Sequence, residues 1–205
     1  MTTARIRLPA AERRAAVLDA ASRVFSRGSY HGTTTAEIAR EAGVTEPILY
    51  RHFASKRDLY LACLDAAWAE VRALWERTVA DEPSAEDWLL AMGRAFFRSE
   101  RNRAVISTLW VQAIAEAGED PVIRRYMRRH MREVHGYVAD VVARAQEQGG
   151  VYVDRDPRAE AWLFLSVGLL KMVSGRLGGL LEGDFPQIVA SRRRWLTGRE
   201  FDGTL

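Results

Sequence analysis

The chain of 205 residues has little cysteine and little lysine: one cysteine, Cys63, and two lysines beside 28 arginines. A lone cysteine excludes a disulfide within the chain and a zinc site built from several cysteines. Its position among apolar residues indicates a small buried side chain rather than a reactive thiol. A composition so poor in cysteine suits a reducing compartment, so we expect a cytoplasmic protein.

Long apolar runs are also missing. The most apolar segment, residues 161–173, is interrupted by Lys171 and followed by Gly175 and Arg176. It is shorter than the roughly 20 apolar residues that span a bilayer, so we interpret it as a buried helix. Residues 1–10 lack the apolar stretch of a signal peptide. We therefore expect no membrane partner.

The sequence lacks motifs for catalysis and for cofactor binding. His130 and His135 lie about 140° apart around a helix, so they miss the i, i+4 spacing with which two histidines chelate zinc. There is no glycine-rich phosphate loop, no serine-centred nucleophile elbow and no carboxylate-rich metal motif. We expect no metal, no cofactor and no enzymatic activity; an enzyme in the C-terminal part is the least favoured alternative.

What the sequence does contain is helical periodicity. Apolar residues make up 48% of the chain, enough for a core, and they recur at helical spacing almost throughout. This pattern predicts an all-α protein of about nine helices, with residues 149–156 as the one short strand candidate. The first expected helix ends at Gly28, and the others occupy residues 34–43, 45–53, 55–81, 84–99, 103–116, 121–148, 157–180 and 184–197.

Positive charge is concentrated towards the N-terminus. Residues 1–60 contain ten basic and six acidic side chains, a net charge of +4, whereas residues 61–205 have a net charge of −1. This asymmetry indicates that the N-terminal part contacts an anionic partner.

Two short helices are predicted within this basic segment. Thr34 and Glu37 have the Thr-x-x-Glu spacing of a capping box and begin a helix that ends at the next glycine. Thr45 can cap the following helix, with Pro47 in its first turn, where a missing N–H costs nothing. Two short helices joined by a tight glycine turn predict a helix-turn-helix over residues 34–53.

The side chains around this motif are suited to DNA. Threonines at a helix N-terminus lie beside backbone N–H groups that favour a phosphate. The start of the second helix is the part that a recognition helix presents to base edges, and Arg51 is best able to distinguish a guanine. A helix-turn-helix also occurs as plain scaffold, in which Tyr50 or His52 would only pack. The candidate DNA contacts are Thr33, Thr34, Thr45, Glu46, Pro47, Tyr50, Arg51, His52 and Lys56.

Residues 32–64, GTTTAEIAREAGVTEPILYRHFASKRDLYLACL, closely resemble the N-terminal domain of TetR-family transcriptional regulators. In that family a helix ending in F-x-x-x-G precedes T-T-x-x-I-A-x-x-A-G-V-[ST], and [LI]-Y-x-[HY]-F-x-[SN]-K-x-x-L follows. The chain departs from the pattern at Ser29, which stands before Tyr30, and at Pro47, where a small residue is commoner. The positions in register are Phe25, Gly32, Thr33, Thr34, Ile38, Ala39, Ala42, Gly43, Val44, Thr45, Leu49, Tyr50, His52, Phe53, Ser55, Lys56 and Leu59.

The resemblance implies a DNA-binding domain over residues 11–71 and a helical ligand-binding and dimerisation domain over residues 72–205. It also implies a homodimer that binds a double-stranded DNA operator and a small-molecule effector. In the family, phosphate-contacting positions match Thr33, Thr34, Tyr50, His52 and Lys56, and groove-facing positions match Thr45, Glu46, Pro47 and Arg51.

The C-terminal part offers candidates for dimerisation and for ligand binding. An apolar seam with small residues on the last two helices suits a dimer interface, although the same residues suit a core within one subunit. Large aromatic side chains suit a cavity wall, although aromatic residues at helical spacing are also typical of plain core. The interface candidates are Leu165, Gly168, Leu169, Met172, Val189 and Trp195; the cavity candidates are Trp88, Phe96, Phe97, Trp110, Tyr126, Met127, Met131, Trp162 and Phe164.

Together these features predict a repressor that binds a palindromic operator as a dimer and is released by a small apolar or amphipathic effector. The alternative is a helical interaction protein, regulated by a protein partner, whose helix-turn-helix is only scaffold. Salt dependence separates the two, because binding through phosphates weakens as salt rises.

Overall fold

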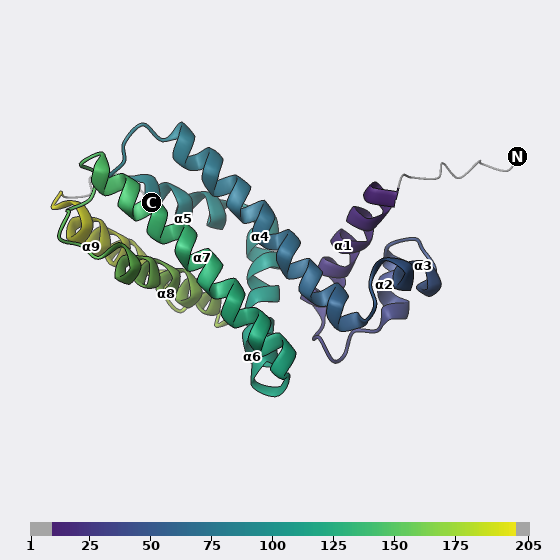
Figure 1. Cartoon of the computed structure of the whole chain (residues 1–205). Coiled ribbons are helices and arrows are strands. Elements are labelled where there is room, and N and C mark those ends of the chain that lie inside the picture. The colour runs from purple at the N-terminus through teal and green to yellow at the C-terminus, as the bar shows by residue number, and fades with distance from the viewer. Residues whose placement is uncertain (1–9, 200–205) are drawn as a thin grey trace, which may run out of the picture. The chain divides into compact units, whose positions relative to one another are not determined.

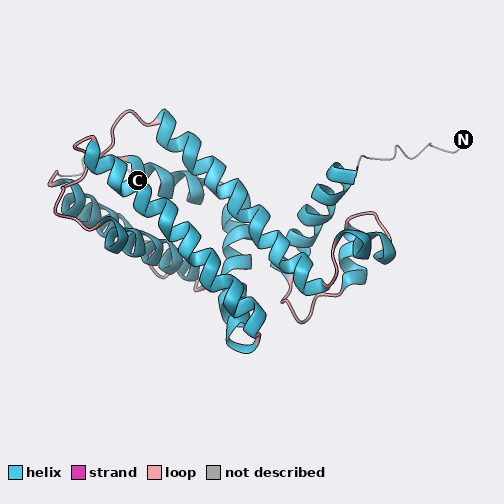
Figure 2. Ribbon diagram, viewed as in Figure 1, coloured by secondary structure: helices cyan, strands magenta, loops and turns pink. Residues whose placement is uncertain are grey.

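The computed structural model of the chain describes residues 10–199, and every regular element in that range is helical (Figure 1 and Figure 2). The all-α class predicted from the sequence is confirmed, and the strand candidate at residues 149–156 forms turns and bends. The helices are α1 (Ala10–Arg27), α2 (Thr35–Glu41), α3 (Glu46–His52), α4 (Lys56–Asp81), α5 (Trp88–Arg98), α6 (Ser107–Glu119), α7 (Pro121–Glu147), α8 (Pro157–Arg176) and α9 (Phe185–Thr197), with a π-helical segment η1 (Asn102–Ile106) before α6.

The chain divides into two compact units within α4, after Trp68. The sequence predicts a boundary close by, after residue 71. The first unit has a core to which α1, α2, α3 and α4 each contribute fully buried side chains, among them Phe25, Ile38 and Leu49. Phe25 meets Tyr60 of α4 edge to face, with ring centroids 4.9 Å apart. These contacts fix α2 and α3 on the two longer helices.

The turn between α2 and α3 requires a glycine. Gly43 has a φ of 65°, in the left-handed region that a side chain disfavours. Its N–H donates to the carbonyl of Arg40 at 3.1 Å, and the N–H of Val44 donates to the carbonyl of Ala39 at 2.9 Å. These bonds satisfy the last carbonyls of α2 and send the chain directly into α3, which is the helix-turn-helix expected from the sequence.

Helix α2 begins with the capping box predicted at Thr34 and Glu37. The Thr34 hydroxyl accepts from the Glu37 N–H at 3.2 Å, and the Glu37 carboxylate accepts from the Thr34 N–H at 3.0 Å. Hydrogen bonds from the backbone N–H and then the hydroxyl of Thr34 lower the pKa of Glu37 below its ordinary value. A lowered folded-state pKa stabilises the helix start above the ordinary carboxylate pKa, and this contribution is lost as the pH falls through the folded-state value.

Helix α7 is central to the second unit, because it packs along both α6 and α8. It begins where Asp120 accepts hydrogen bonds from the N–H groups of Val122 and Ile123, at 2.7 and 3.2 Å. Buried Val134 and Val138 lie four residues apart and form part of the apolar stripe that faces the neighbouring helices.

The segment after α7 passes unusually close to the loop before α5. The N–H of Gly150 donates to the carbonyl of Ala145 at 2.8 Å and closes the helix end. A Cβ atom on Gly150 would lie 2.5 Å from the carbonyl carbon of Ala85. Only a residue without a side chain permits this approach of two backbone segments.

We expect Gly150→Ala to lower the free energy of unfolding by about 1–3 kcal/mol, because the added methyl group forces the backbone at Ala85 to move. Gly136→Ala is the matched control inside α7: its Cβ would meet no atom within 4 Å. That change should instead raise stability by about 0.5–1 kcal/mol, through better helix propensity. Urea denaturation followed by tryptophan fluorescence measures both, and equal stabilities for the two variants would contradict the close approach.

Candidate functional site

One face of the helix-turn-helix is open to solvent and has polar side chains that make no hydrogen bonds within the described residues 10–199. Leu49 is fully buried and holds α3 on its inner side, so Thr45, Pro47 and Arg51 are exposed around it. Thr45 is the N-cap residue of α3, yet its hydroxyl makes no capping hydrogen bond. The Arg51 guanidinium makes no hydrogen bond or ion pair with any residue in the range 10–199. A free hydroxyl just before the first turn of α3 and a free guanidinium in its last turn are groups that can hydrogen-bond base edges.

A hydrogen-bonded group joins the starts of α2 and α3. The Thr35 hydroxyl donates to Oε1 of Glu46 at 2.6 Å and lies 3.2 Å from the hydroxyl of Tyr50, which is 47% exposed. The carboxylate of Glu46 is therefore held in the first turn of α3, where the helix dipole favours negative charge. An ionised carboxylate only accepts hydrogen bonds, so Glu46 suits a base amino group and not a phosphate.

The side chains of Lys56 and Thr33 are engaged within the first unit. The side chain of Thr33 is only 4% exposed, and its carbonyl accepts a hydrogen bond from Nζ of Lys56 at 2.8 Å. The same ammonium lies 3.5 Å from the carbonyl of His31 and 4.7 Å from the ring centroid of Tyr30. Lys56 thus ties the loop after α1 to the start of α4 and positions the backbone at Thr33.

The structure therefore separates the nine candidate DNA contacts by exposure. The Thr33 side chain is buried, so it can position the neighbouring backbone but cannot contact DNA itself. Thr34 is exposed, but its hydroxyl is engaged in the capping box. The exposed candidates are Thr34, Thr45, Pro47, Tyr50 and Arg51, and those of intermediate exposure are Glu46, His52 and Lys56.

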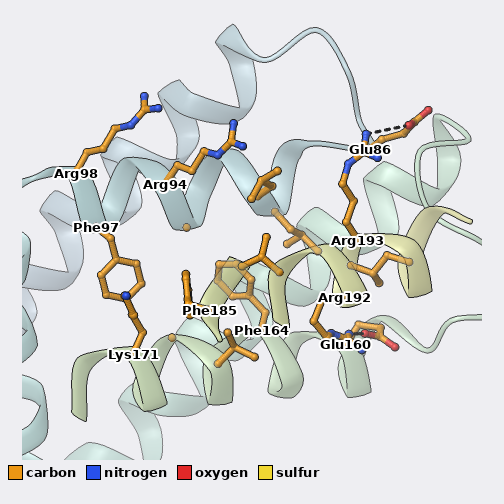
Figure 3. Close-up of a pocket in the computed structure, with 17 residues that line it drawn as sticks. Glu86, Arg94, Phe97, Arg98, Glu160, Phe164, Lys171, Phe185, Arg192 and Arg193 are labelled. Atoms are coloured by element: carbon orange, nitrogen blue, oxygen red, sulfur yellow. Dashed lines mark hydrogen bonds and ion pairs between the residues drawn. The ribbon is translucent and has the colours of Figure 1, made fainter. Parts of the chain in front are cut away.

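The second unit contains a cavity of about 380 Å³ between α5, α8 and α9 (Figure 3). Three phenylalanines, Phe97, Phe164 and Phe185, come one from each of these helices, and aliphatic side chains fill the rest of the wall. A volume of this size and an apolar wall are typical of a small-molecule site. The aliphatic lining residues are Leu89, Leu90, Val167, Val189 and Leu196.

Two groups of ion pairs close one end of the cavity and attach α9. Glu160 of α8, only 5% exposed, pairs with Arg192 and accepts a hydrogen bond from Nε1 of Trp195 at 2.9 Å. Arg193 donates through Nε to Oδ1 of Asp87 at 2.8 Å and lies 3.6 Å from Oε2 of Glu86. The carboxylates at this end are thus neutralised by arginines of α9.

The opposite end of the cavity contains one cation. Figure 3 shows Lys171 rising from α8 towards Phe97, far along the cavity from the Glu86 and Glu160 pairs. Its Nζ lies 4.4 Å from the ring centroid of Phe185. The side chains of Arg94 and Arg98 leave α5 on the side away from the cavity.

Only two of the nine aromatic or methionine candidates, Phe97 and Phe164, line this cavity. Trp88 is buried and donates through Nε1 to the carbonyl of Glu82, and Trp162 stacks on the ring of His135 with centroids 4.2 Å apart. The other candidates lie elsewhere in the unit: Phe96, Tyr126 and Met127 are buried, and Trp110 and Met131 are of intermediate exposure.

The candidate interface residues are likewise divided. Gly168 and Val189 line the cavity, whereas Trp195 is half exposed on α9. Leu165, Leu169 and Met172 are of intermediate exposure on α8.

Sequence reasoning did not select Lys171 or Phe185 for the cavity. The signal available was that Lys171 is the only charge inside the most apolar segment of the chain. Between residues 10 and 199 there is no group of three or more side chains that could hold a metal ion. No helix in that range is long and apolar enough to cross a membrane.

Two family models match the chain. One, described as bacterial regulatory proteins of the tetR family, covers residues 17–63, the first unit with its helix-turn-helix. The other, described as the C-terminal part of BetI-type transcriptional repressors, covers residues 85–167 of the second unit.

Curated relatives are transcriptional regulators. The HTH-type transcriptional activator FasR of Mycolicibacterium smegmatis is 55% identical over 58 residues, which are 28% of this chain and 26% of that protein. The chain thus matches only about a quarter of that activator's length. The HTH-type transcriptional regulator BetI of Burkholderia mallei is 28% identical over 178 residues, 84% of each chain.

Solved structures share the fold. A transcriptional regulator from Saccharomonospora viridis, solved in complex with choline, superposes with a TM-score of 0.64. The match covers 90% of this chain and 93% of that one at 23% sequence identity.

Substitutions should distinguish the internal role of Lys56 from the external position of Arg51. We expect Lys56→Met to lower the free energy of unfolding by about 1–2 kcal/mol, because one charge-assisted hydrogen bond and one cation–π contact are lost. Arg51→Ala should change it by less than about 0.5 kcal/mol, because that side chain is exposed and unpaired. Thermal unfolding of both variants measures the difference, and a destabilised Arg51→Ala protein would show that Arg51 is part of the packing.

Proposed function

The chain belongs to the TetR family of transcriptional regulators, and we propose that it is a repressor that binds a palindromic operator as a homodimer and is released by a small effector. The observation that carries the proposal is the exposed side of α3, where the Thr45 hydroxyl at the start of the helix and the Arg51 guanidinium in its last turn have no hydrogen-bond partner among residues 10–199. Repression is favoured over activation because the match in the second unit is to BetI-type repressors, whereas the activator FasR matches over 58 residues only.

The polar groups of the first unit support a division of labour on DNA. Arg51 and Thr45 would read base edges in the major groove, and Glu46, held by Thr35, would accept a hydrogen bond from a base amino group. Tyr50 and Thr34 would contact phosphates and fix the register. The net positive charge of the N-terminal part favours this partner.

An exposed apolar stripe on the second unit supports the homodimer. Leu163, Leu170 and Leu177 follow one another at seven-residue intervals along α8 and its end, and each is between 42% and 61% exposed. Side chains seven apart share one face of a helix, the spacing of an interhelical seam. Trp162 and the half-exposed Trp195 of α9 add aromatic area beside it. We propose that two copies of α8 and α9 pair through this surface.

The cavity between α5, α8 and α9 supports regulation by a small molecule. An effector releases the operator if it binds better to the conformation that does not fit DNA. Because α8 and α9 contribute both the cavity wall and the exposed surface described above, an occupant of the cavity can alter that surface. The Saccharomonospora viridis regulator was solved with choline, a cation, and the side chains that line the cavity of this chain decide whether a ligand of that class fits.

The competing function is a protein-interaction module that uses the helix-turn-helix as scaffold. Its binding would not depend on phosphates. Operator binding should instead weaken with salt, by about 0.9 log unit per log unit of salt for each phosphate neutralised. A flat salt dependence would favour the interaction module.

In vitro selection of genomic fragments by the purified protein should enrich an inverted repeat, with half-site centres about 34–36 Å apart, because two recognition helices enter successive major grooves. Arg51→Ala should relax the preference at one base position in each half-site by about 1–3 kcal/mol. Arg132→Ala, which removes the same charge from an exposed site on α7, should leave the preference unchanged. Sequence preference that survives in Arg51→Ala would refute the assignment of Arg51 to the groove.

We expect Leu170→Glu to convert the dimer into monomers, because it places two carboxylates in the apolar seam. Operator affinity should fall by about 100-fold or more, since each half-site is then bound separately. Ile114→Glu, at an apolar position of similar exposure on α6, is the control and should remain dimeric. Sedimentation velocity and operator titration report the two effects, and a dimeric Leu170→Glu protein would place the interface elsewhere.

A further inference from the structure

We infer that the cavity between α5, α8 and α9 binds an amphipathic anion: a molecule with an apolar tail and one negatively charged head, which pairs with Lys171. This inference rests on the proposed effector function, and it names the chemical class of the effector. The head group can be a carboxylate, a sulfate or a phosphate monoester, because all three offer anionic oxygens to an ammonium.

The apolar tail of the ligand is inferred from the apolar side chains that line the cavity. Between its two ends the cavity is bounded by phenylalanine rings and by leucine and valine side chains. An uncharged or charged polar group placed there would lose its hydration without finding a hydrogen-bond partner. A hydrocarbon or aromatic body loses water favourably, at roughly 25 cal/mol per Å² of apolar surface buried.

No carboxylate of the cavity is available to a cationic ligand. The two acidic lining residues are Glu86 and Glu160. Glu160 is buried, with one oxygen paired to Arg192 and the other accepting from Trp195. Glu86 is paired with two arginines, one of α9 and one just after it. Removing Arg192 would leave the buried charge of Glu160 uncompensated, which is costly.

Part of the aromatic surface that would attract a cation is also occupied. Quaternary ammonium groups are bound in proteins over the faces of aromatic rings. In this cavity the face of Phe185 already has the Lys171 ammonium 4.4 Å from its centroid. A ligand cation over Phe185 would have to displace that ammonium, and anywhere near it the cation would lie beside a like charge, which is unfavourable.

Lys171 has no acidic partner and makes no side-chain hydrogen bond among residues 10–199, and its ammonium lies on the ring of Phe185. An ammonium has three donors, so the ring contact leaves N–H groups free for anionic oxygens. The residue is partly buried at the apolar end, where an ion pair is screened less than at the surface. Lys171 is also one of only two lysines in a chain with 28 arginines, so a lysine at this position is unusual for the composition of the chain.

The test is isothermal titration calorimetry with three probes of equal chain length, decanoate, decanol and decyltrimethylammonium, each below its micelle concentration. We expect decanoate to bind most tightly. Lys171→Met should weaken decanoate by about 10- to 100-fold, the worth of one hydrogen bond to a charged group, and leave decanol nearly unchanged. Lys171→Arg, which keeps the charge, should retain most of the affinity.

The control variant is Arg98→Gln, because Arg98 borders the cavity but directs its guanidinium away from it. It should change decanoate affinity by no more than about twofold. Tighter binding of decyltrimethylammonium than of decanoate, decanoate binding that is equal in the Lys171→Met and wild-type proteins, or no binding of any probe would overturn the inference.

Operator titration with and without decanoate tests the proposed function separately. Decanoate that binds through Lys171 and weakens operator binding supports both conclusions. Binding through Lys171 with no effect on the operator supports the anion site and contradicts the effector role. Failure to bind any DNA would contradict the proposed function, while the calorimetric comparison of the three probes would still decide the chemistry of the cavity.

Discussion

Helix α9 is held to the rest of the second unit by ion pairs rather than by a broad apolar face. Arg192 and Arg193 of α9 pair with Glu160 of α8 and with Glu86 and Asp87 before α5. Buried pairs of this kind add little net stability, yet removing one partner is costly, so they fix geometry more than they supply free energy. The pairs hold one end of α9 against α5 and α8 and leave the space between the three helices open along the apolar middle. The existence of the cavity, its charged end and the exposed position of Trp195 all depend on this attachment.

In the first unit, polar side chains serve two different purposes. The side chains of Thr34, Thr35 and Lys56 form hydrogen bonds within the protein. Thr34 caps α2, Thr35 bonds to Glu46, and Lys56 bonds to the loop after α1. The side chains of Thr45 and Arg51 form no hydrogen bonds with the described residues of the chain. The first group stiffens the surface that the second group presents, and side chains fixed in advance lose less entropy when they meet a ligand.

Local patterns explain why most of the fold could be predicted from the sequence. The capping box at Thr34 and Glu37, the left-handed turn at Gly43 and the apolar spacing of each helix act over four or five residues, so they can be recognised without a structure. The exposed residues at the start of α3 followed from the same patterns.

The internal roles of Thr33 and Lys56 could not be predicted, because they arise from contacts across the unit: the bond from Lys56 spans 23 residues. The cavity depends on contacts between residues that are still farther apart in the sequence, since the bond between Arg193 and Asp87 joins residues 106 positions apart. Aromatic residues could be recognised as candidates, but which of them meet depends on how α5, α8 and α9 are assembled. Two of the nine candidates therefore reached the cavity wall, and the cation at its end was found only from the structure.

The scarcity of lysine has a practical consequence. Each of the two units contains one lysine, and each ammonium lies on an aromatic ring, that of Lys56 on Tyr30 and that of Lys171 on Phe185. Reductive methylation with isotope-labelled formaldehyde would therefore place one resolved NMR probe in the DNA-binding unit and one in the cavity, besides any at a free amino terminus. Ring currents should shift the two signals in ways that depend on each stacking geometry. A single spectrum would then follow both units at once during a titration.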